Sequence, residues 1–260
     1  MCCINAMHFI YHFKRSVHTA TLMALKSLLL LLATLISLKS FSQAVEIINQ
    51  ADIKNLPESI KFAFLEAATD TSEIKYVATI LARDKNKKSN IEFLYSEIRK
   101  QANKLGANCY KLKSFTRGGK RNEAILVLDS YFASDSLLKI NTRNHEKNVV
   151  FLFGKEREDE KTITFDLNGE EKEIKAGTFY KIFLKEGENI KVSKGGFAGS
   201  VMLLIGERDS QPCFYALSGF GLADMSQQSS NSISFNTGGI SRIGNISLGL
   251  LLTQLLKQAN

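Results

Sequence analysis

Few side chains in this sequence have the types and spacing that chemistry needs. Cys109 and Cys213 are the only cysteines after residue 3, and His145 is the only histidine after residue 18. A nucleophilic site requires a nucleophile, a base and an orienting group close together, and no such pattern surrounds these three residues. We therefore expect no catalytic residue and no enzyme activity, and we interpret His145 as an exposed linker residue.

Two short stretches have the composition of ligand loops. Glu156 to Glu160 (EREDE) is acidic, but it lacks the fixed spacing and turn glycine of a calcium loop. Gly195 to Gly199 (GGFAG) lacks the Lys-Ser/Thr ending of a phosphate loop. The first is interpreted as a solvated loop, and we expect neither a metal ion nor a cofactor at either stretch.

The chain opens with the pattern of a secretory signal peptide that starts at Met23. Lys26 is its charged residue, and an apolar run of about a dozen residues follows before small residues. That run is shorter than the roughly 20 residues that cross a bilayer. We predict that residues 1–42 are an N-terminal extension plus signal peptide; the alternative is an uncleaved anchor. Residues 1–22 are interpreted as an over-extended reading frame.

Removal of residues 1–42 leaves few side chains that could bind a metal ion. It takes away Cys2, Cys3 and three of the four histidines, so these should not be assembled into a metal site. No cysteine stands at the cleavage site, so we expect an exported protein, periplasmic or associated with the outer envelope, and not a lipoprotein. Whether Cys109 and Cys213 pair in an oxidising compartment stays open.

The charge of the exported chain is only mildly basic. The full sequence has 34 basic and 26 acidic residues, and four of the basic ones lie in residues 1–42. The net charge therefore falls from +8 to about +4. Nucleic-acid binding needs basic residues gathered on one face, and export argues against it, so we expect no nucleic-acid partner.

Residues 45–135 have the pattern of a small α+β sandwich domain. Residues 73–83 alternate apolar and polar side chains, as a strand does. Residues 91–105 carry one apolar stripe at helical spacing and end at Gly106, where a left-handed residue can stop a helix. Strands are predicted over 109–115 and 123–133, so one helix should cover one face of a sheet.

The end of that helix carries a family resemblance. The residues concerned are Ala102, Leu105, Gly106, Ala107 and Asn108. This step from helix to strand resembles the RcsF-like outer-membrane lipoproteins and the YbjQ-like proteins, which are small α+β modules. The resemblance implies a sensor or accessory module, in which the glycine and asparagine have structural roles.

Residues 146–222 have the pattern of an all-β sandwich, with turn signals every eight to twelve residues. The predicted strands are 148–153, 162–167, 172–174, 179–184, 190–193, 200–205 and 213–217. Asn168-Gly169 is a strong signal for a two-residue hairpin. Together with Gly177, Tyr180 and Gly187, it is similar to PEGA-like and carboxypeptidase-regulatory-like modules of exported bacterial proteins. This resemblance implies an accessory domain.

Residues 223–260 combine a flexible segment with a short apolar helix. Ser, Asn, Gln and Gly dominate from Ser226 to Asn245, and leucines then recur on one stripe after Ile246. The helix is too short to span a bilayer. It is predicted to dock on the β-domain; the alternatives are a partner protein and contact with the membrane surface.

Taken together, the sequence predicts an α+β protein with a small α/β sandwich domain followed by an all-β sandwich domain. We expect a non-enzymatic envelope protein for interaction or sensing, with another envelope protein as its partner. The alternative is a periplasmic module that binds a ligand or metal through Cys109 or the basic loops at Lys85 to Lys88 and Arg117 to Arg121. The oligomeric state stays open.

Overall fold

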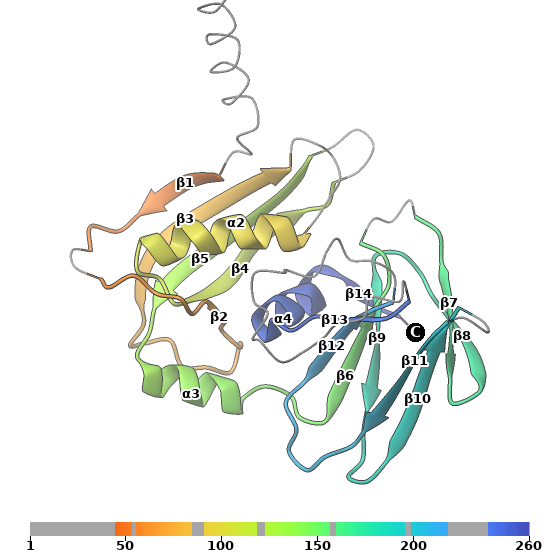
Figure 1. Cartoon of the computed structure of the whole chain (residues 1–260). Coiled ribbons are helices and arrows are strands. Elements are labelled where there is room, and N and C mark those ends of the chain that lie inside the picture. The colour runs from red at the N-terminus through yellow and green to blue at the C-terminus, as the bar shows by residue number, and fades with distance from the viewer. Residues whose placement is uncertain are drawn as a thin grey trace, which may run out of the picture. The chain divides into compact units, whose positions relative to one another are not determined.

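A computed structural model describes residues 45–53, 56–84, 91–118, 123–156, 160–195, 199–217 and 239–259. These residues contain three helices and fourteen strands in three sheets (Figure 1). The fold is therefore α+β and rich in sheet, as predicted. The predictions for residues 1–42, for the basic loop at 85–88 and for the Ser- and Asn-rich stretch at 226–238 fall outside the described residues. Among the residues that the structure describes, no helix is long and apolar enough to cross a membrane.

The first sheet holds five strands in the order β1-β3-β5-β4-β2. Its strands are β1 (Val45–Gln50), β2 (Ala63–Phe64), β3 (Lys75–Asp84), β4 (Cys109–Thr116) and β5 (Ala124–Phe132). Helix α2 (Ile91–Lys104) lies across β3 and β5 and buries its apolar stripe there (Figure 1). The predicted helix and its three neighbouring strands are confirmed, with small shifts at their ends.

The glycine-alanine-asparagine step ends α2 and connects it to β4. Gly106 has φ +82°, and the Ala107 amide donates to the Ala102 carbonyl at 3.0 Å. This bonding closes the helix in a Schellman motif, which favours glycine. The Asn108 side chain then donates to the Ala133 carbonyl and accepts from the Ala133 amide, at 2.7 and 2.9 Å. The step thus ends the helix and ties the start of β4 to the end of β5.

The other two sheets are built by residues 149–258. One sheet has the order β11-β10-β7-β8 and the other β13-β12-β6-β9-β14. Their strands are β6 (Val149–Phe153), β7 (Ile163–Leu167), β8 (Glu170–Ile174), β9 (Thr178–Phe183), β10 (Asn189–Lys194), β11 (Ser200–Ile205), β12 (Cys213–Ala216), β13 (Ser241–Arg242) and β14 (Lys257–Gln258). All seven strands predicted for this part of the chain are present.

The Asn-Gly hairpin between β7 and β8 is confirmed. Asn168 has φ +54° and Gly169 has φ +88°, so both central residues adopt the left-handed conformation that a type I′ turn requires. The Asp166 side chain accepts from the Gly169 amide at 2.8 Å. The sequence signal was strong because few residue pairs tolerate two successive positive φ angles.

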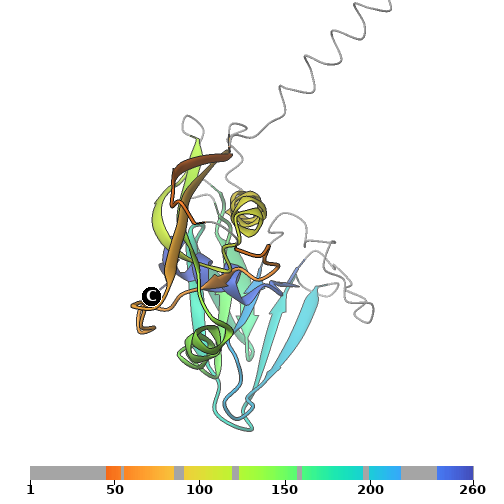
Figure 2. The same cartoon turned by 90° about the vertical axis from the view of Figure 1, so that its left-hand side faces the viewer.

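Helix α3 (Asp135–Arg143) was not predicted from the sequence. The Ser134 side chain caps its first turn by accepting from the Leu137 amide, and Leu138 is its one buried leucine. With so few apolar residues, its stripe is too short for a clear helical period. The helix connects β5 to the residues that precede β6 (Figure 2).

Helix α4 (Ile246–Leu255) is the predicted C-terminal helix, and it contacts both parts of the chain. It lies against β2, β4 and α2 on one side and against β12 and β14 on the other (Figure 1). Residues Leu248 to Leu252 are all buried there. The predicted docking on the β-strands is therefore only half of its environment.

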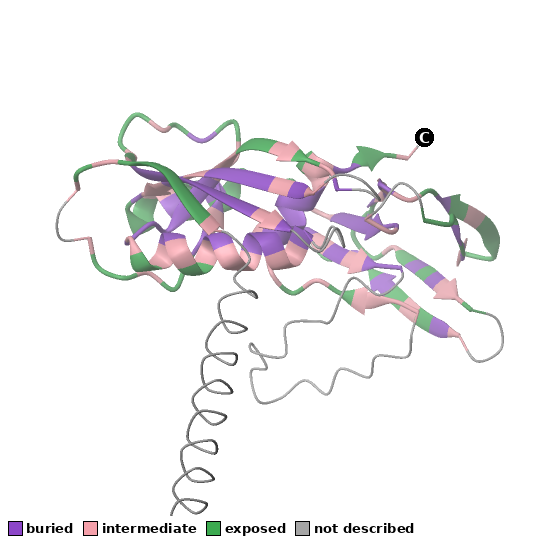
Figure 3. Cartoon of the chain, turned by 90° about the horizontal axis from the view of Figure 1, so that it is seen from above, coloured by how far each residue is buried: buried purple, intermediate pink, exposed green. Residues whose placement is uncertain are grey.

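The pattern of buried residues differs between the sheet that α2 covers and the four-stranded sheet. The strands that α2 covers are mostly buried, whereas buried residues alternate with more exposed ones along β10 and β11 of the four-stranded sheet (Figure 3). Alternation of this kind is typical of a sheet with one face on a core and one face in solvent.

A cationic pocket as the candidate functional site

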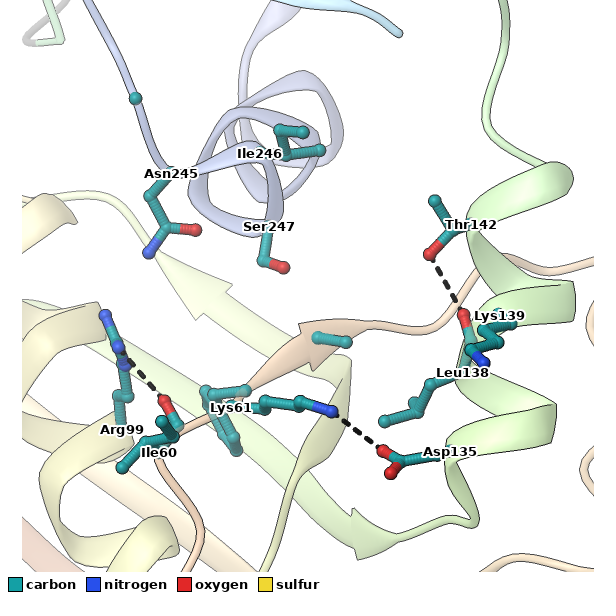
Figure 4. Close-up of a pocket in the computed structure, with 13 residues that line it drawn as sticks. Ile60, Lys61, Arg99, Asp135, Leu138, Lys139, Thr142, Asn245, Ile246 and Ser247 are labelled. Carbon is teal, nitrogen blue, oxygen red and sulfur yellow. Dashed lines mark hydrogen bonds and ion pairs between the residues drawn. The ribbon is translucent and has the colours of Figure 1, made fainter.

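A pocket of about 510 Å³ lies where four separate segments meet. Residues 60–63 before and within β2 form one wall, Arg99 of α2 a second, α3 a third, and residues 244–247 at the start of α4 the fourth (Figure 4). We call it the cationic pocket, because Lys61, Arg99 and Lys139 all line it.

The floor of the pocket is apolar and aromatic. Phe62 lines it and stacks on Tyr110 with ring centroids 4.6 Å apart, and the Tyr95 hydroxyl donates to the Phe62 carbonyl at 3.3 Å. Burial raises the pKa of Tyr95 to about 12 and that of Tyr110 well above its ordinary value. Both phenols therefore stay neutral and act as hydrogen-bond donors that brace the floor.

The α3 wall is held by a buried asparagine. The Asn141 side chain donates to the Phe64 carbonyl and accepts from the Glu66 amide and the Thr69 hydroxyl, each at 2.8 Å. Asn141 is almost fully buried. A buried amide with three partners fixes the orientation of a helix, because breaking any of these bonds would leave a polar group unsatisfied.

The α4 wall is held by two hydrogen bonds around Ser247. The Tyr110 hydroxyl donates to the Ser247 carbonyl at 2.7 Å, and the Phe64 amide donates to the Ser247 hydroxyl at 3.2 Å. The Asn245 side chain caps the helix by accepting from the Leu248 amide at 3.1 Å. These bonds place residues 245–247 beside β2 and the segment before it, which carries Lys61.

The charges around the pocket are mainly positive. Lys61 pairs with Asp135 at 2.8 Å, and the Lys61 ammonium lowers the pKa of that carboxyl, which stays ionised. Arg99 donates one hydrogen bond to the Ile60 carbonyl at 3.2 Å. Asp135 is the one acidic residue among the residues that line the pocket. The lining thus has three cations and one carboxylate.

This arrangement is suited to binding an anion. Guanidinium and ammonium groups donate strong hydrogen bonds to carboxylates and phosphates. Neither histidine nor cysteine is found among the lining residues, and the single carboxylate is paired with Lys61. The groups in the pocket can neutralise and orient a ligand, and none of them forms a nucleophile-base pair.

The two cysteines of the described residues lie away from this pocket, and both are free thiols. Cys109 is fully buried on β4, and burial raises the pKa of its thiol to about 12. Its sulfur lies 3.5 Å from the Tyr131 carbonyl. Cys213 is half-buried on β12. A thiol with so high a pKa remains protonated at neutral pH and is a poor metal ligand or nucleophile.

The interpretation of His145 as an exposed linker residue is wrong. Its side chain is only 8% exposed, and its Nε2 atom lies 4.0 Å from Glu66 Oε1. Burial lowers the pKa of His145, with the Gln211 side chain beside it. The residue is buried because α3, which ends just before it, packs on the segment that contains Glu66.

The acidic stretch at 156–160 has a structural role at its first residue. The Glu156 carboxylate accepts from the Ile91 amide at 3.0 Å and so caps the start of α2. Burial is the largest of the causes that together raise the pKa of Glu156 to about 8; the hydrogen bond from the Ile91 amide lowers this pKa, and the nearby Glu92 and Glu160 raise it. Residues 157–159 lie outside the described part of the chain. Within that part, no cluster of three His, Cys, Asp or Glu side chains could hold a metal ion.

The basic loop at 117–121 is described only in part. The Arg117 side chain donates to the Leu255 carbonyl at 3.0 Å, at the C-terminal end of α4, where a cation is favoured by the helix dipole. The described portion of this loop therefore supports α4 and does not line the pocket.

Sequence reasoning missed the cationic pocket because its residues share no motif. Lys61, Arg99 and Lys139 come from three segments that are far apart in the chain, and each looks like an ordinary surface cation. Comparisons of the chain with protein-family models, with curated proteins and with solved structures found no match.

Proposed function

We propose that this chain is an exported, non-enzymatic envelope protein for interaction or sensing, and that it binds a small anionic molecule in the cationic pocket. The observation that carries the proposal is the lining of this pocket, which contains three cations and a single carboxylate that is already paired with Lys61. An unbalanced positive lining attracts an anionic ligand, since the ligand would neutralise it.

The pocket also constrains the class of ligand. Its volume of about 510 Å³ falls within the roughly 300–1,000 Å³ of small-molecule sites. Phe62, Leu138 and Ile246 supply apolar lining next to the cations. The ligand that fits best is a small molecule with one or more carboxylate or phosphate groups and an apolar portion.

The wider context of the proposal comes from the sequence. The signal-peptide pattern supports a periplasmic or outer-envelope location without lipid modification, and mild basicity supports a partner other than nucleic acid. We propose another envelope protein as the partner. We also propose that residues 45–135 and 146–222 act as an α/β sandwich module and a β-sandwich module, of the RcsF-like or YbjQ-like and the PEGA-like kinds respectively.

The proposal is tested by ligand titration of residues 43–260. Isothermal titration calorimetry with phenyl phosphate, which has an apolar portion, and with inorganic phosphate should show saturable binding of at least one of these anions. Ionic strength is matched throughout with sodium chloride, because screening alone weakens any exposed charge interaction. Failure of both anions to bind would overturn the assignment of the pocket.

Variants give the test its specificity. Arg99→Gln and Lys139→Gln should each weaken binding by about tenfold or more, in line with loss of a charged hydrogen bond of roughly 1.5–3 kcal/mol. Lys104→Gln is the matched control, since Lys104 is an exposed cation on the same helix as Arg99 and lies outside the pocket. Asp135→Asn should strengthen binding, because it removes the carboxylate that competes with the ligand for Lys61.

A further inference from the structure

Strand β11 is an exposed edge of the four-stranded sheet. It pairs along its whole length with β10 on one side, and no described strand pairs with its other side. Its sequence, SVMLLI, has no charged residue. Val201, Leu203 and Ile205 point to solvent with exposed fractions of 64%, 61% and 57%, while Leu204 between them is buried.

The other edges of the described sheets carry features that block pairing. Strand β8, at the opposite edge of the same sheet, reads EEKEI and presents a row of charges. Strand β1 has Glu46 and an irregular register between Ile47 and Asn49. Strands β2, β13 and β14 have only two residues each. Charges, bulges and shortness are the usual protections of edge strands, and β11 has none of them.

The exposed apolar residues are confined to the edge itself. On the same face of the sheet, β10 places Asn189 beside Ile205, Lys191 beside Leu203 and Ser193 beside Val201. A partner that covered the face of the sheet would have to bury these polar residues. A partner strand added to the edge would cover the apolar row and leave the polar row in solvent.

A second copy of the same strand is complementary to this edge. In an antiparallel pair centred on Leu203, each Leu203 lies opposite its counterpart, and each Val201 lies opposite an Ile205. Residues directly opposite in an antiparallel pair point to the same face, so six apolar side chains would form one continuous strip. No like charges would meet, because the strand has none.

We propose that β11 pairs antiparallel with β11 of a second copy of this chain, so that the two four-stranded sheets join into one sheet across a twofold axis. The assembly ends at two copies, because the pairing uses the unprotected edge of each sheet and the remaining edge, β8, is charged. Strand addition pairs the backbone of residues 201–205 with that of the second copy and buries the apolar row at the same time.

The size of the contact determines the strength of the dimer. The pairing uses five residues on each side, 201–205, which is few compared with the roughly 20–30 residues of a standard interface. We therefore expect a reversible dimer, with a dissociation constant on the order of 10–100 µM. Because the contact is uncharged, the dissociation constant should change little between low and high salt.

Sedimentation velocity of residues 43–260 tests the proposal, since Ala44–Asn260 forms one compact unit. Over roughly 1–500 µM, a range that brackets the expected constant, the chain should pass from monomer to dimer. Leu203→Lys should weaken the dimer by at least tenfold, and its unchanged circular dichroism should show that the fold is intact. Ile48→Lys is the matched control, because Ile48 is an exposed apolar residue, 56% exposed, on the edge strand β1.

The outcomes separate the proposal from its alternatives. A monomer at every concentration would overturn it, including the case in which a different protein covers β11. Larger oligomers, a dimer that survives Leu203→Lys, or a dimer that is lost in Ile48→Lys would overturn it equally.

A crosslink locates the contact directly. In a Cys213→Ser background, Leu203→Cys should give a disulfide-linked dimer under mild oxidation, because the two substituted residues lie opposite each other at the twofold axis. Ile48→Cys should stay monomeric under the same conditions. Crosslinking of Ile48→Cys in place of Leu203→Cys would assign the contact to β1 and contradict the proposal.

Discussion

Two apolar clusters in this chain are built in different ways. The sandwich cluster contains buried residues of residues 150–217 alone, among them Leu152 and Val192. The α4 cluster contains residues of α2, β3 and β5, of β6 and β12, and of α4 itself. Strand β6 serves both, since Phe151 and Phe153 face the α4 cluster while Val150 and Leu152 face the sandwich cluster. One cluster is local, whereas the other joins parts of the chain that are distant in sequence.

The C-terminal helix α4 is therefore a structural element that both parts of the chain share. Its leucines fill space between two sets of strands, so the stability of both sets depends on it. The buried residues of the sandwich cluster include none from α4, although β6 contributes to both clusters. Truncation of a side chain in the α4 cluster should therefore destabilise both parts of the chain, whereas a similar truncation in the sandwich cluster should mainly destabilise the strands around it.

Removal of α4 is expected to have the largest effect. Truncation after Asn245 removes five buried leucines (Leu248, Leu250, Leu251, Leu252 and Leu256), each worth roughly 1.5–3 kcal/mol when fully buried. The truncated chain should lose its cooperative thermal transition at the wild-type temperature and aggregate, because Phe214 and its neighbours become exposed. Circular dichroism melting and light scattering measure this. Equal melting of the two chains would show that α4 stabilises neither part.

A matched pair of leucine truncations distinguishes the clusters. Leu251→Ala in the α4 cluster and Leu152→Ala in the sandwich cluster both remove an almost fully buried side chain, so each should cost roughly 2–5 kcal/mol. Hydrogen exchange should be faster in both β5 and β6 for Leu251→Ala, and mainly in β7 and β10 for Leu152→Ala. Identical exchange maps for the two variants would show that the α4 cluster does not join the two parts of the chain.

The buried Glu156 at the start of α2 makes the free energy of unfolding depend on pH. Burial raises the pKa of Glu156 from its ordinary 4.5 to about 8, so the folded chain holds an extra proton between these values. The stability from this group is complete below about pH 4.5 and is lost as the pH rises towards 8.

Glu156→Gln isolates this contribution, because the amide can still accept from the Ile91 amide but does not titrate. The stability of the wild type relative to the variant should fall by a few kcal/mol across the window, at about 1.4 kcal/mol per pKa unit. Urea denaturation at pH 5, 6.5 and 8 measures it. Parallel pH profiles for the two proteins would refute the buried carboxyl.

The smallest expected effect concerns the closeness of α4 to the ring of Phe214. A Cβ atom added at Gly249 would lie 2.3 Å from Phe214 Cγ, whereas one added at Gly244 would meet nothing within 4 Å. Gly249→Ala should therefore cost roughly 1–3 kcal/mol through overpacking, and Gly244→Ala should stay within about 0.5 kcal/mol of the wild type. Urea denaturation of both variants measures the difference. A neutral Gly249→Ala would mean that the helix can move away from the ring.

Much of the local structure could be predicted from the sequence, because the signals are short-range. The alternation over 73–83 predicted β3, the stripe over 91–105 predicted α2, and Asn168-Gly169 predicted its hairpin. Each signal depends on the backbone preferences and burial pattern of neighbouring residues, which hardly change when the rest of the chain folds. Helix α3 was missed because its apolar residues are too few to show a period.

The candidate site could not be predicted in the same way, because its residues come together only through contacts between segments that are far apart in the chain. Lys61, Arg99 and Lys139 line one pocket only because Asn141 fixes α3 against residues 64–69 and Tyr110 fixes α4 at Ser247. His145 became buried through the same packing of α3. Local sterics and hydrophobic period were enough to predict α2, α4 and strands β3 to β12 to within a few residues of their ends, whereas α3 and strands β1, β2, β13 and β14 were not predicted. Which cations share a pocket, and where the C-terminal helix packs, follow only from the folded chain, because both depend on contacts between residues far apart in the sequence.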